Sequence, residues 1–226
     1  MSEIVFEHVM HRYDGDAVLS DVSLRLTERR IGVVGANGSG KSTLARLVNG
    51  LVSPTLGRVL VDGRDVARNG REVRRRVGFV FTNPDNQIVM PTVREDVAFS
   101  LRRLRLEPAD AAARVDRALE RFGLIELADR PAHRLSGGQK QLLALAAVLV
   151  AEPAVVVADE PTTLLDARNT LLVEQHFAGL DEQLILVTHR LEAVESFDRV
   201  LVVEGGRIVA DGAPADALGA YRGLLR

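Results

Sequence analysis

Cysteine is absent from the 226-residue sequence, so disulfide frameworks and thiolate metal sites are excluded. An excess of positive charge is also absent, because 29 Lys and Arg residues face 31 Asp and Glu residues, for a net charge of −2. The chain lacks the basic field that draws proteins onto nucleic acid or anionic bilayers. We therefore expect no nucleic-acid partner.

Long uninterrupted apolar runs are absent as well. The start, MSEIVFEHVM, shows no basic segment followed by an apolar run and a cleavage site, so no secretory leader is expected. The most apolar window, 142–159, is broken by Glu152 and Pro153, which leaves too few residues to cross about 30 Å of hydrocarbon. We expect a cytoplasmic chain in which this window forms a buried helix, a turn and a buried strand.

The rest of the sequence predicts alternating strands and helices, in a chain whose 46% apolar content supports one compact unit with one or two lobes. Thr92 and Glu95 predict a capping box, and Ser136 predicts a second helix cap. The expected strands cover 3–9, 19–26, 30–34, 76–81, 154–159 and 184–188. The expected helices cover 41–48, 92–104, 108–122, 137–150, 167–178 and 191–196. A final hairpin over 199–212 turns at Gly205 and Gly206.

This order predicts an α/β fold with a core of parallel strands. The two β-rich ends of the chain predict an antiparallel subdomain beside the core. The block from about 85 to 135 is almost entirely helical, so we expect it to form a helical subdomain.

The stretch GANGSGKST, residues 35–43, combines three glycines with one lysine. Its spacing, G-x-x-x-x-G-K-S, lies between an expected buried strand and an expected helix. Glycines let successive backbone N–H groups point at phosphate oxygens, and the helix adds its positive N-terminal end. The pattern predicts that Lys41 reaches the β- and γ-phosphates of a nucleotide and that Ser42 holds Mg²⁺.

The alternative is a flexible glycine turn that binds nothing. Two observations count against it: the flanking strand and helix have the order that the motif requires, and the chain has only two lysines, Lys41 and Lys140. A lysine at this position is therefore not a generic surface cation.

The stretch VVVADE, residues 155–160, is an apolar strand that ends in two carboxylates. This placement carries both acids to the carboxyl edge of the sheet, where open α/β sheets bind ligands. Asp159 would orient the Mg²⁺ shell, and Glu160 would polarise the attacking water. Two acids after a strand can also be a helix-capping turn, but a phosphate loop in the same chain favours the chemical interpretation.

The stretch LSGGQ, residues 135–139, places Ser136 as the cap of a helix whose first turn holds two glycines. This is a second anion-binding helix end, although the phosphate loop already encloses the nucleotide phosphates. The second end is useful if it faces a nucleotide held by another molecule.

With these motifs the chain resembles the ATP-binding cassette ATPases over nearly its whole length. The resemblance implies a P-loop NTPase core with a parallel sheet, an antiparallel β-subdomain and a helical subdomain. It implies Glu160, His189 and Lys41 as catalytic residues, and Ser42 and Asp159 as Mg²⁺ ligands. The positions implied to contact ATP are Tyr13, Gly35, Asn37, Gly38, Ser39, Gly40, Lys41, Ser42, Thr43, Ser136, Gly137, Gly138, Gln139 and Asp166.

The family mechanism implies two ATP molecules sandwiched between two protomers, each held by the phosphate loop of one chain and the Ser136 turn of the other. ATP binding then drives closure of the dimer, and hydrolysis reopens it. All motifs occur in one chain, so a homodimer is the simplest arrangement, and a heterodimer with a related ATPase remains open.

The stretch TNPDNQIVMPTVREDVAFSL, residues 82–101, resembles more narrowly the ATPases of energy-coupling factor importers for vitamins and metal ions. In those relatives this segment forms a groove for arginine-bearing helices of a transmembrane T subunit, which works with a substrate-capture S subunit. Asp85, Glu95 and Asp96 would suit such helices, although an ordinary solvated helix face is an equal alternative. This resemblance implies a peripheral ATPase at the cytoplasmic membrane face, without direct contact to the transported substrate.

One position departs from the family pattern. The family has a Gln in the Q-loop where its amide reaches Mg²⁺ and the attacking water, whereas this chain has Thr82. A shorter hydroxyl side chain puts this metal contact in question, and Gln87 could replace it only if the loop folds differently.

We expect one domain over 1–226, with a core from about 1–84 and 136–226, a helical subdomain from about 85–135, and no C-terminal regulatory domain. Three functions remain open: the ATPase of an energy-coupling factor importer, that of a conventional importer, and a soluble cassette ATPase such as one serving iron–sulfur cluster assembly. Biotin is the first guess for the substrate, with cobalt or nickel next.

Overall fold

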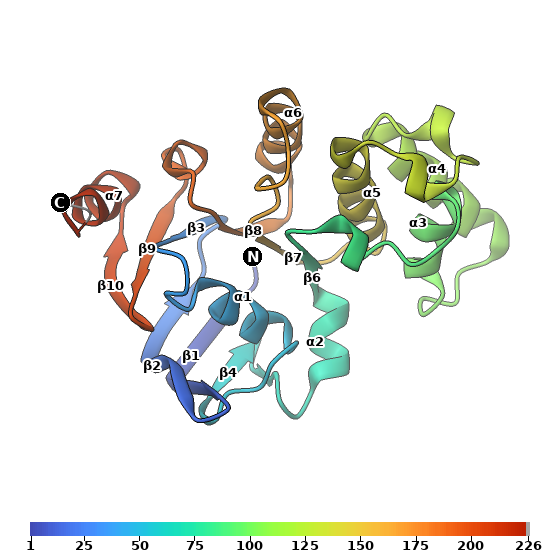
Figure 1. Cartoon of the computed structure of the whole chain (residues 1–226). Coiled ribbons are helices and arrows are strands. Elements are labelled where there is room, and N and C mark those ends of the chain that lie inside the picture. The colour runs from blue at the N-terminus through green and yellow to red at the C-terminus, as the bar shows by residue number, and fades with distance from the viewer. Residues whose placement is uncertain (225–226) are drawn as a thin grey trace. The chain divides into compact units, whose positions relative to one another are not determined.

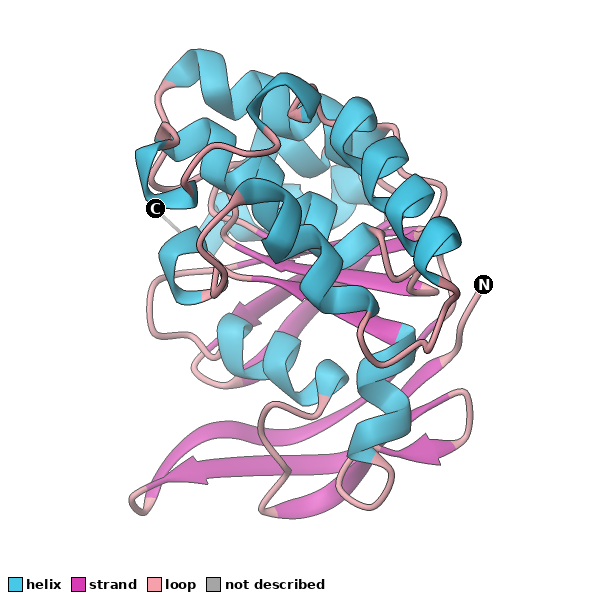
Figure 2. Cartoon of the chain, turned by 90° about the vertical axis from the view of Figure 1, so that its right-hand side faces the viewer, coloured by secondary structure: helices cyan, strands magenta, loops and turns pink. Residues whose placement is uncertain are grey.

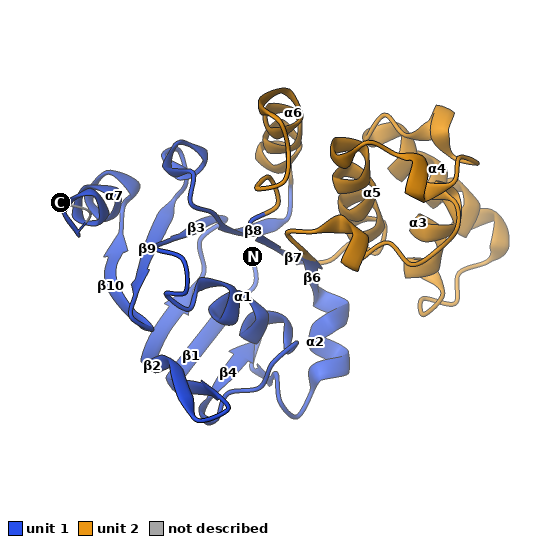
Figure 3. Ribbon diagram, in the orientation of Figure 1, with its two compact units in different colours: residues 1–79, 154–160, 181–226 blue, residues 80–153, 161–180 orange. Residues whose placement is uncertain are grey.

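The computed structural model describes residues 1–224, which form two compact units (Figure 3). Unit 1 contains 1–79, 154–160 and the described residues from 181 onward, and unit 2 contains 80–153 and 161–180. The expected helical block 85–135 lies within unit 2, which also includes two later helices. Positions 225–226 of the expected domain lie outside the described residues.

A six-stranded sheet occupies unit 1, in the order β10-β9-β3-β8-β7-β6. Its strands are β3 (Arg30–Val34), β6 (Val77–Val80), β7 (Val155–Asp159), β8 (Gln183–Val187), β9 (Arg199–Glu204) and β10 (Arg207–Gly212). Strands β9, β3, β8 and β7 pair in parallel, and β10 pairs antiparallel with β9 at the edge. All five residues of both β7 and β8 are buried, as expected of parallel strands covered on both faces.

The second sheet of unit 1 is antiparallel, in the order β2-β1-β4-β5. Its strands are β1 (Ile4–Tyr13), β2 (Asp16–Leu26), β4 (Leu56–Val61) and β5 (Arg64–Asp65). In Figure 2 its long strands form the magenta ribbon at the bottom. The antiparallel sheet contains only N-terminal strands, so the expectation that both chain ends build it was wrong for the C-terminal hairpin. That hairpin extends the parallel sheet, because β9 pairs with β3.

Three α-helices belong to the described part of unit 1, and they are labelled in Figure 1: α1 (Lys41–Asn49), α2 (Gly70–Arg76) and α7 (Pro214–Leu224). Helix α1 begins directly after the phosphate loop and buries Leu44, Leu47 and Val48. It ends at Gly50, whose left-handed backbone caps the helix. The expected helix at 191–196 is a short 3₁₀ turn, Leu191–Val194.

Unit 2 is helical. It contains α3 (Val93–Leu101), α4 (Pro108–Arg121), α5 (Gly137–Leu149), α6 (Ala167–Ala178) and the 3₁₀ turns Pro84–Asn86, Ile125–Leu127 and Ala132–Arg134. The predicted capping box of Thr92 and Glu95 is confirmed, although α3 ends at Leu101, three residues before the expected end. Among residues 1–224, none of the helices has the length and apolar character needed to span a membrane.

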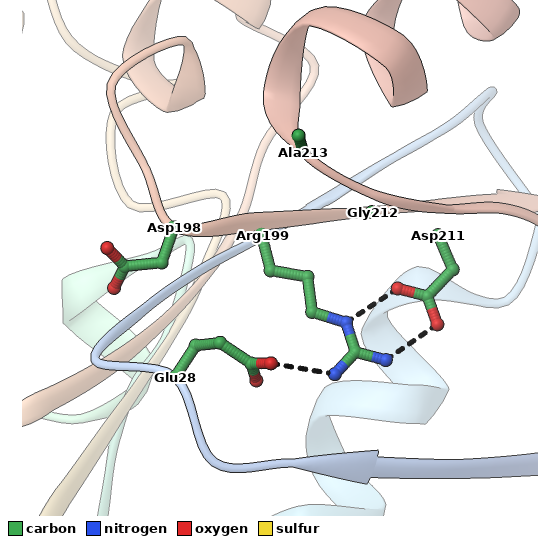
Figure 4. Close-up of a pocket in the computed structure, with 6 residues that line it drawn as sticks. All are labelled: Glu28, Asp198, Arg199, Asp211, Gly212 and Ala213. Atoms are coloured by element: carbon green, nitrogen blue, oxygen red, sulfur yellow. Dashed lines mark hydrogen bonds and ion pairs between the residues drawn. The ribbon is translucent and has the colours of Figure 1, made fainter.

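Arg199, at the start of β9, forms hydrogen bonds with Asp211 of β10 and with Glu28 (Figure 4). Its guanidinium donates to both carboxylate oxygens of Asp211 at 2.6 and 2.7 Å, and to Glu28 at 3.0 Å. It also donates to the carbonyl of Arg25 at 2.8 Å. Hydrogen bonds to Asp211 raise the pKa of Arg199, so the guanidinium stays charged at every physiological pH. It joins the edge hairpin to the segment after β2.

Candidate nucleotide-binding and hydrolysis site

Three neighbouring parallel strands of unit 1 end in the motifs that the sequence singled out. The phosphate loop follows β3, Asp159 and Glu160 lie at the end of β7, and His189 lies two residues after β8. The backbone register brings these ends together, since Glu160 N–H donates to the Val187 carbonyl and Thr188 N–H donates to the Val33 carbonyl. The sheet therefore gathers the predicted phosphate-binding and hydrolytic residues of unit 1 at one edge.

The phosphate loop is shaped by glycines that no other residue could replace without strain. Gly40 has φ 107°, and a Cβ there would lie 2.8 Å from the Val18 carbonyl oxygen. Gly35 has φ 148°, and its Cβ would lie 2.0 Å from the Val203 carbonyl oxygen. Both positions need a left-handed backbone and close packing on neighbouring strands. The Gly206 N–H also donates to the Ser39 carbonyl at 3.0 Å, which braces the loop from the β9–β10 turn.

Lys41 bends back over the loop that precedes it. Its Nζ donates to the carbonyls of Gly35 at 2.9 Å and Ala36 at 2.7 Å, and the residue is only 6% exposed. Burial lowers the pKa of Lys41, while nearby Glu160 and Asp159 act in the opposite direction. The arrangement holds one cation inside the loop, where it can meet phosphate oxygens.

Ser42 and Asp159 form a pair of oxygen donors beside this lysine. Ser42 Oγ donates to Asp159 Oδ1 at 2.8 Å, and Arg46 Nη2 lies 3.7 Å from the other carboxylate oxygen. Burial raises the pKa of Asp159, and the hydrogen bond from Ser42 opposes this shift. A hydroxyl and a carboxylate in contact are the hard oxygen donors that Mg²⁺ takes from proteins, so the donor set fits this ion.

Glu160 and His189 form the second pair at this edge. His189 Nδ1 lies 2.7 Å from Glu160 Oε2, and the side chain of Glu160 is 16% exposed. Glu160 has φ 49°, an unusual value for a residue other than glycine, and its backbone is held by the bond to the Val187 carbonyl. A carboxylate oriented by an imidazole is an arrangement suited to accepting a proton from water.

Tyr13 lies at the end of β1 and is 41% exposed, with its ring edge-to-face against His11 at 4.5 Å. It pairs with Asp16 across the turn into β2, the strand that continues to Val18 beside Gly40. An exposed aromatic face on this hairpin is compatible with stacking on a base.

The signature residues belong to unit 2. Ser136 caps α5 in a capping box with Gln139, in which each side chain bonds the backbone N–H of the other residue. Gly138 packs against α6 so closely that a Cβ would lie 2.2 Å from Asn169 Oδ1. Asp166 caps α6 by accepting from the Asn169 N–H at 2.8 Å and from the Asn169 amide at 2.8 Å. Asn169 therefore links the signature turn to Asp166, a role that its sequence context did not reveal.

The three acidic residues expected to suit a partner's arginine all have partners within unit 2, although Asp85 and Glu95 are exposed to solvent. Asp85 forms an ion pair with Lys140 at 2.7 Å, and Glu95 belongs to the capping box. Asp96 is only 3% exposed and accepts from the N–H groups of Val89 at 2.8 Å and Met90 at 2.9 Å. For Asp96, the expected contact with a partner's arginine and the alternative of a solvated helix face were both wrong, because the side chain is buried.

Gln87 does not take over the Q-loop function either. Its amide is occupied by the backbone of Phe81 and Ala144, as part of the fold of unit 2. Thr82 is therefore the residue at the family's Q-loop position, and Gln87 does not replace it. Two further residues escaped the sequence reasoning: Arg46 near Asp159, and Gln141, a polar residue within the apolar helix α5. Neither residue had a signal in the sequence, because Gln141 follows the polar residues Gln139 and Lys140, before the apolar part of α5 begins.

Comparisons with known proteins identify the family of the chain. Residues 19–163 match the family model described as ABC transporter. The chain is 48% identical to the biotin transport ATP-binding protein BioM of Rhizobium etli over 97% of each chain. It is 42% identical to the energy-coupling factor transporter ATP-binding protein EcfA1 of Caldanaerobacter subterraneus subsp. tengcongensis, over 88% of this chain and 74% of that one. The structure of CbiO1 from Clostridium perfringens, part of the ABC transporter complex CbiONQ, aligns with a TM-score of 0.85 at 33% identity, over 99% of this chain and 92% of that one.

Proposed function

Since the chain belongs to the ABC transporter ATPase family and is an ATP-binding ATPase, we propose that it drives an energy-coupling factor importer for a vitamin, with biotin as the first candidate. The observation that carries this proposal is the 48% identity to a biotin transport ATP-binding protein over 97% of both chains. The similarity to EcfA1 and to a subunit of the CbiONQ complex supports the energy-coupling factor type.

The proposed reaction is hydrolysis of the bond between the β- and γ-phosphates. The loop N–H groups and Lys41 hold the phosphates, and bound Mg²⁺, with Ser42 and Asp159 as its protein ligands, would neutralise charge on the phosphate oxygens. Glu160 would accept a proton from the attacking water, and His189 would orient Glu160 through the 2.7 Å contact. The second ring nitrogen of His189 would be available to hold the γ-phosphate. The products are ADP and inorganic phosphate.

The proposed working form is a dimer of this chain, or a heterodimer with a related ATPase. Ser136, Gly137 and Gly138 of one protomer would contact the ATP held by the phosphate loop of the other. The capped helix end in unit 2 supports this arrangement, because Ser136 and Gly137 are exposed at the start of a helix, where backbone donors suit an anion. Tyr13 would stack on the adenine.

The proposed membrane partner is a T subunit, which would dock on unit 2 and place the ATPase at the cytoplasmic membrane face. Asp85 and Glu95 are exposed and would belong to the docking surface, whereas Asp96 is buried. Exposed apolar residues of the same region would add to this surface. Val89 is 63% exposed, Phe99 is 42% exposed and Leu104 is 37% exposed. An S subunit would then capture the vitamin, without contact to this chain.

The test is purification of the tagged chain from native membranes in mild detergent, combined with uptake of labelled biotin by the same cells. We expect a T-type and a small S-type membrane protein to accompany the tagged chain. Uptake should disappear when the only copy carries Lys41→Ala. Soluble partners alone would contradict the importer, and membrane partners with normal biotin uptake would contradict biotin as the substrate while leaving the importer intact.

A further inference from the structure

Phe81, the first residue after β6, has both of its backbone groups held by glutamine side chains. Its N–H donates to Gln87 Oε1 at 3.1 Å, and its carbonyl accepts from Gln141 Nε2 at 3.2 Å. The Phe81 carbonyl belongs to the peptide group that continues into Thr82. The two glutamines therefore fix the backbone at the point where the chain enters the Q-loop position.

Both glutamines connect this backbone to helix α5. Gln141 is itself a residue of α5 and is only 1% exposed. Gln87 donates through Nε2 to the Ala144 carbonyl of α5 at 3.2 Å. The ion pair of Asp85 with Lys140 adds a third connection. Residues 140, 141 and 144 lie within about one turn of a helix, so the segment 81–87 is tied to a single patch of α5.

The connection requires, at position 87, a side chain that accepts one hydrogen bond and donates another. One side chain accepts from an N–H group and donates to a carbonyl, which an ionised carboxylate cannot do and an apolar side chain cannot replace. These hydrogen bonds are partly buried, so removal of the Gln87 side chain leaves a donor and an acceptor with reduced access to water. The connection therefore depends on paired donor and acceptor groups rather than on packing alone.

The position of these contacts along α5 gives them a functional consequence. Helix α5 begins with the signature residues Gly137 and Gly138, and the three anchoring positions follow within seven residues of Gly137. A helix transmits displacement over such a distance as a rigid rod, because its backbone hydrogen bonds connect successive turns. Whatever moves the signature turn must also move the backbone that carries Thr82.

We propose that Gln87 and Gln141 are positioning residues that fasten Thr82 to the signature helix, so that the Q-loop position and the Ser136 turn move as one body during the ATPase cycle. This inference goes beyond the proposed function, since it holds for any transporter or partner that the ATPase serves. It explains how a Q-loop position without the family's glutamine keeps a defined place relative to α5.

The first experiment measures amide hydrogen exchange of Phe81 by NMR in the full chain. Gln87→Met should accelerate exchange at Phe81 by about tenfold or more, because the N–H loses its acceptor. Gln175→Met is the matched control: Gln175 is an exposed residue of α6, and its replacement should leave Phe81 unchanged. Unchanged exchange in Gln87→Met would overturn the connection itself.

The second experiment measures steady-state ATP hydrolysis. In Gln87→Met and Gln141→Met, kcat should fall about fivefold, because displacement of a positioned group lowers the rate of chemistry. The KM for ATP should stay within about twofold, because the phosphate loop is unchanged. The double variant should lose less than the product of the single effects, since both residues act on Phe81. If Gln87→Met exchanges faster at Phe81 but keeps the wild-type kcat, the glutamines shape the loop without positioning Thr82 for catalysis. That result would overturn the proposal.

The variant Gln87→Glu tests whether the loss of activity comes from lost hydrogen bonds at position 87 or from a general loss of folding. Its protonated acid can donate to the Ala144 carbonyl and accept from the Phe81 N–H, whereas its ionised form cannot donate. Relative to the wild type at the same pH, Phe81 protection and kcat in Gln87→Glu should recover as pH falls, and Gln87→Met should not recover. An equal response of both variants to pH would contradict the proposal.

Discussion

Asp96 illustrates how a single side chain can shape a loop. It is buried, and one of its oxygens accepts from two successive backbone N–H groups, those of Val89 and Met90. Burial raises the pKa of Asp96, and the two hydrogen bonds only partly offset this shift. The carboxyl group is therefore needed as an acceptor, while its charge is a cost to the folded state.

Two substitutions of Asp96 separate the effect of its negative charge on stability from the effect of its hydrogen-bond acceptor. Asp96→Asn keeps the acceptor oxygen and removes the charge, so at pH 7 the variant should be at least as stable as the wild type. Asp96→Ala leaves two N–H groups without their acceptor, and we expect a loss of about 2–4 kcal/mol. Urea unfolding monitored by circular dichroism measures both free energies of unfolding.

The pH dependence of this comparison has a definite sign. The folded-state pKa of Asp96 lies above its unfolded value, so the folded wild type binds the proton more tightly. As pH falls from 7 through the folded-state pKa, the free energy of unfolding of the wild type should rise relative to that of Asp96→Asn. The difference between the two free energies of unfolding should therefore become smaller. A difference that widens toward pH 5 would show that the charged form is the stabilised one.

At the scale of residues, the sequence was most informative where function needs local chemistry. Lys41, Ser42 and the loop glycines are adjacent in the chain, so their spacing alone predicts a phosphate loop. Gln87 and Asn169 could not be assigned in this way, because each also contacts a residue of α5 that is distant in sequence: Gln87 bonds to Ala144, and Asn169 lies against Gly138. Asp96 was misjudged since an acidic residue in an amphipathic pattern gives no sign of the loop that covers it.

At the scale of elements, the junction of α5 and α6 explains one of the two signature glycines. A Cβ on Gly138 would lie 2.2 Å from Asn169 Oδ1 and 2.9 Å from Asn169 Cβ, so rotation of the amide alone cannot relieve the clash. A Cβ on Gly137 would meet only Leu165 Cδ2 at 3.6 Å, an ordinary contact. The two neighbouring glycines therefore differ in what they do for the fold.

Alanine at each position tests this difference. Gly138→Ala should destabilise the protein by about 1–3 kcal/mol, because the helices must move apart. Gly137→Ala should change stability by about 0.5 kcal/mol or less, or stabilise slightly, since alanine favours helix. Urea unfolding of both variants provides the measurement, with each acting as the control for the other. Equal losses would contradict close packing of α5 on α6 at Gly138.

The elements best predicted from sequence were those with strong local signals. The capped helices at 92 and 136 and the buried strands at 30–34 and 155–159 were located within one residue at their starts. Strand β4 and helices α2 and α7 were missed, because arginine-rich or glycine-flanked segments carry little hydrophobic periodicity. The C-terminal hairpin was recognised, but its pairing with β3 depends on a contact across more than half of the chain.

At the scale of the whole molecule, the predicted site residues divide between the two units. Unit 1 carries the phosphate loop, Asp159, Glu160 and His189, whereas unit 2 carries Thr82 and the Ser136 turn. In the proposed dimer, each active site combines unit 1 of one protomer with the Ser136 turn of the other. A chain with a defective phosphate loop and a chain with a defective Ser136 turn should therefore form one intact site when they pair with each other.

Mixing two inactive variants tests this assembly. Lys41→Ala removes the phosphate-loop cation, and Ser136→Arg blocks the signature turn, so each variant alone should hydrolyse almost no ATP. In an equal mixture half of the dimers are hybrids, and each hybrid contains one site with both parts intact. The mixture should therefore recover about a quarter of the wild-type rate per chain. Mixing either variant with the doubly substituted chain forms no intact site and serves as the control. A mixture no faster than its separate components would contradict a site shared between two copies of the chain.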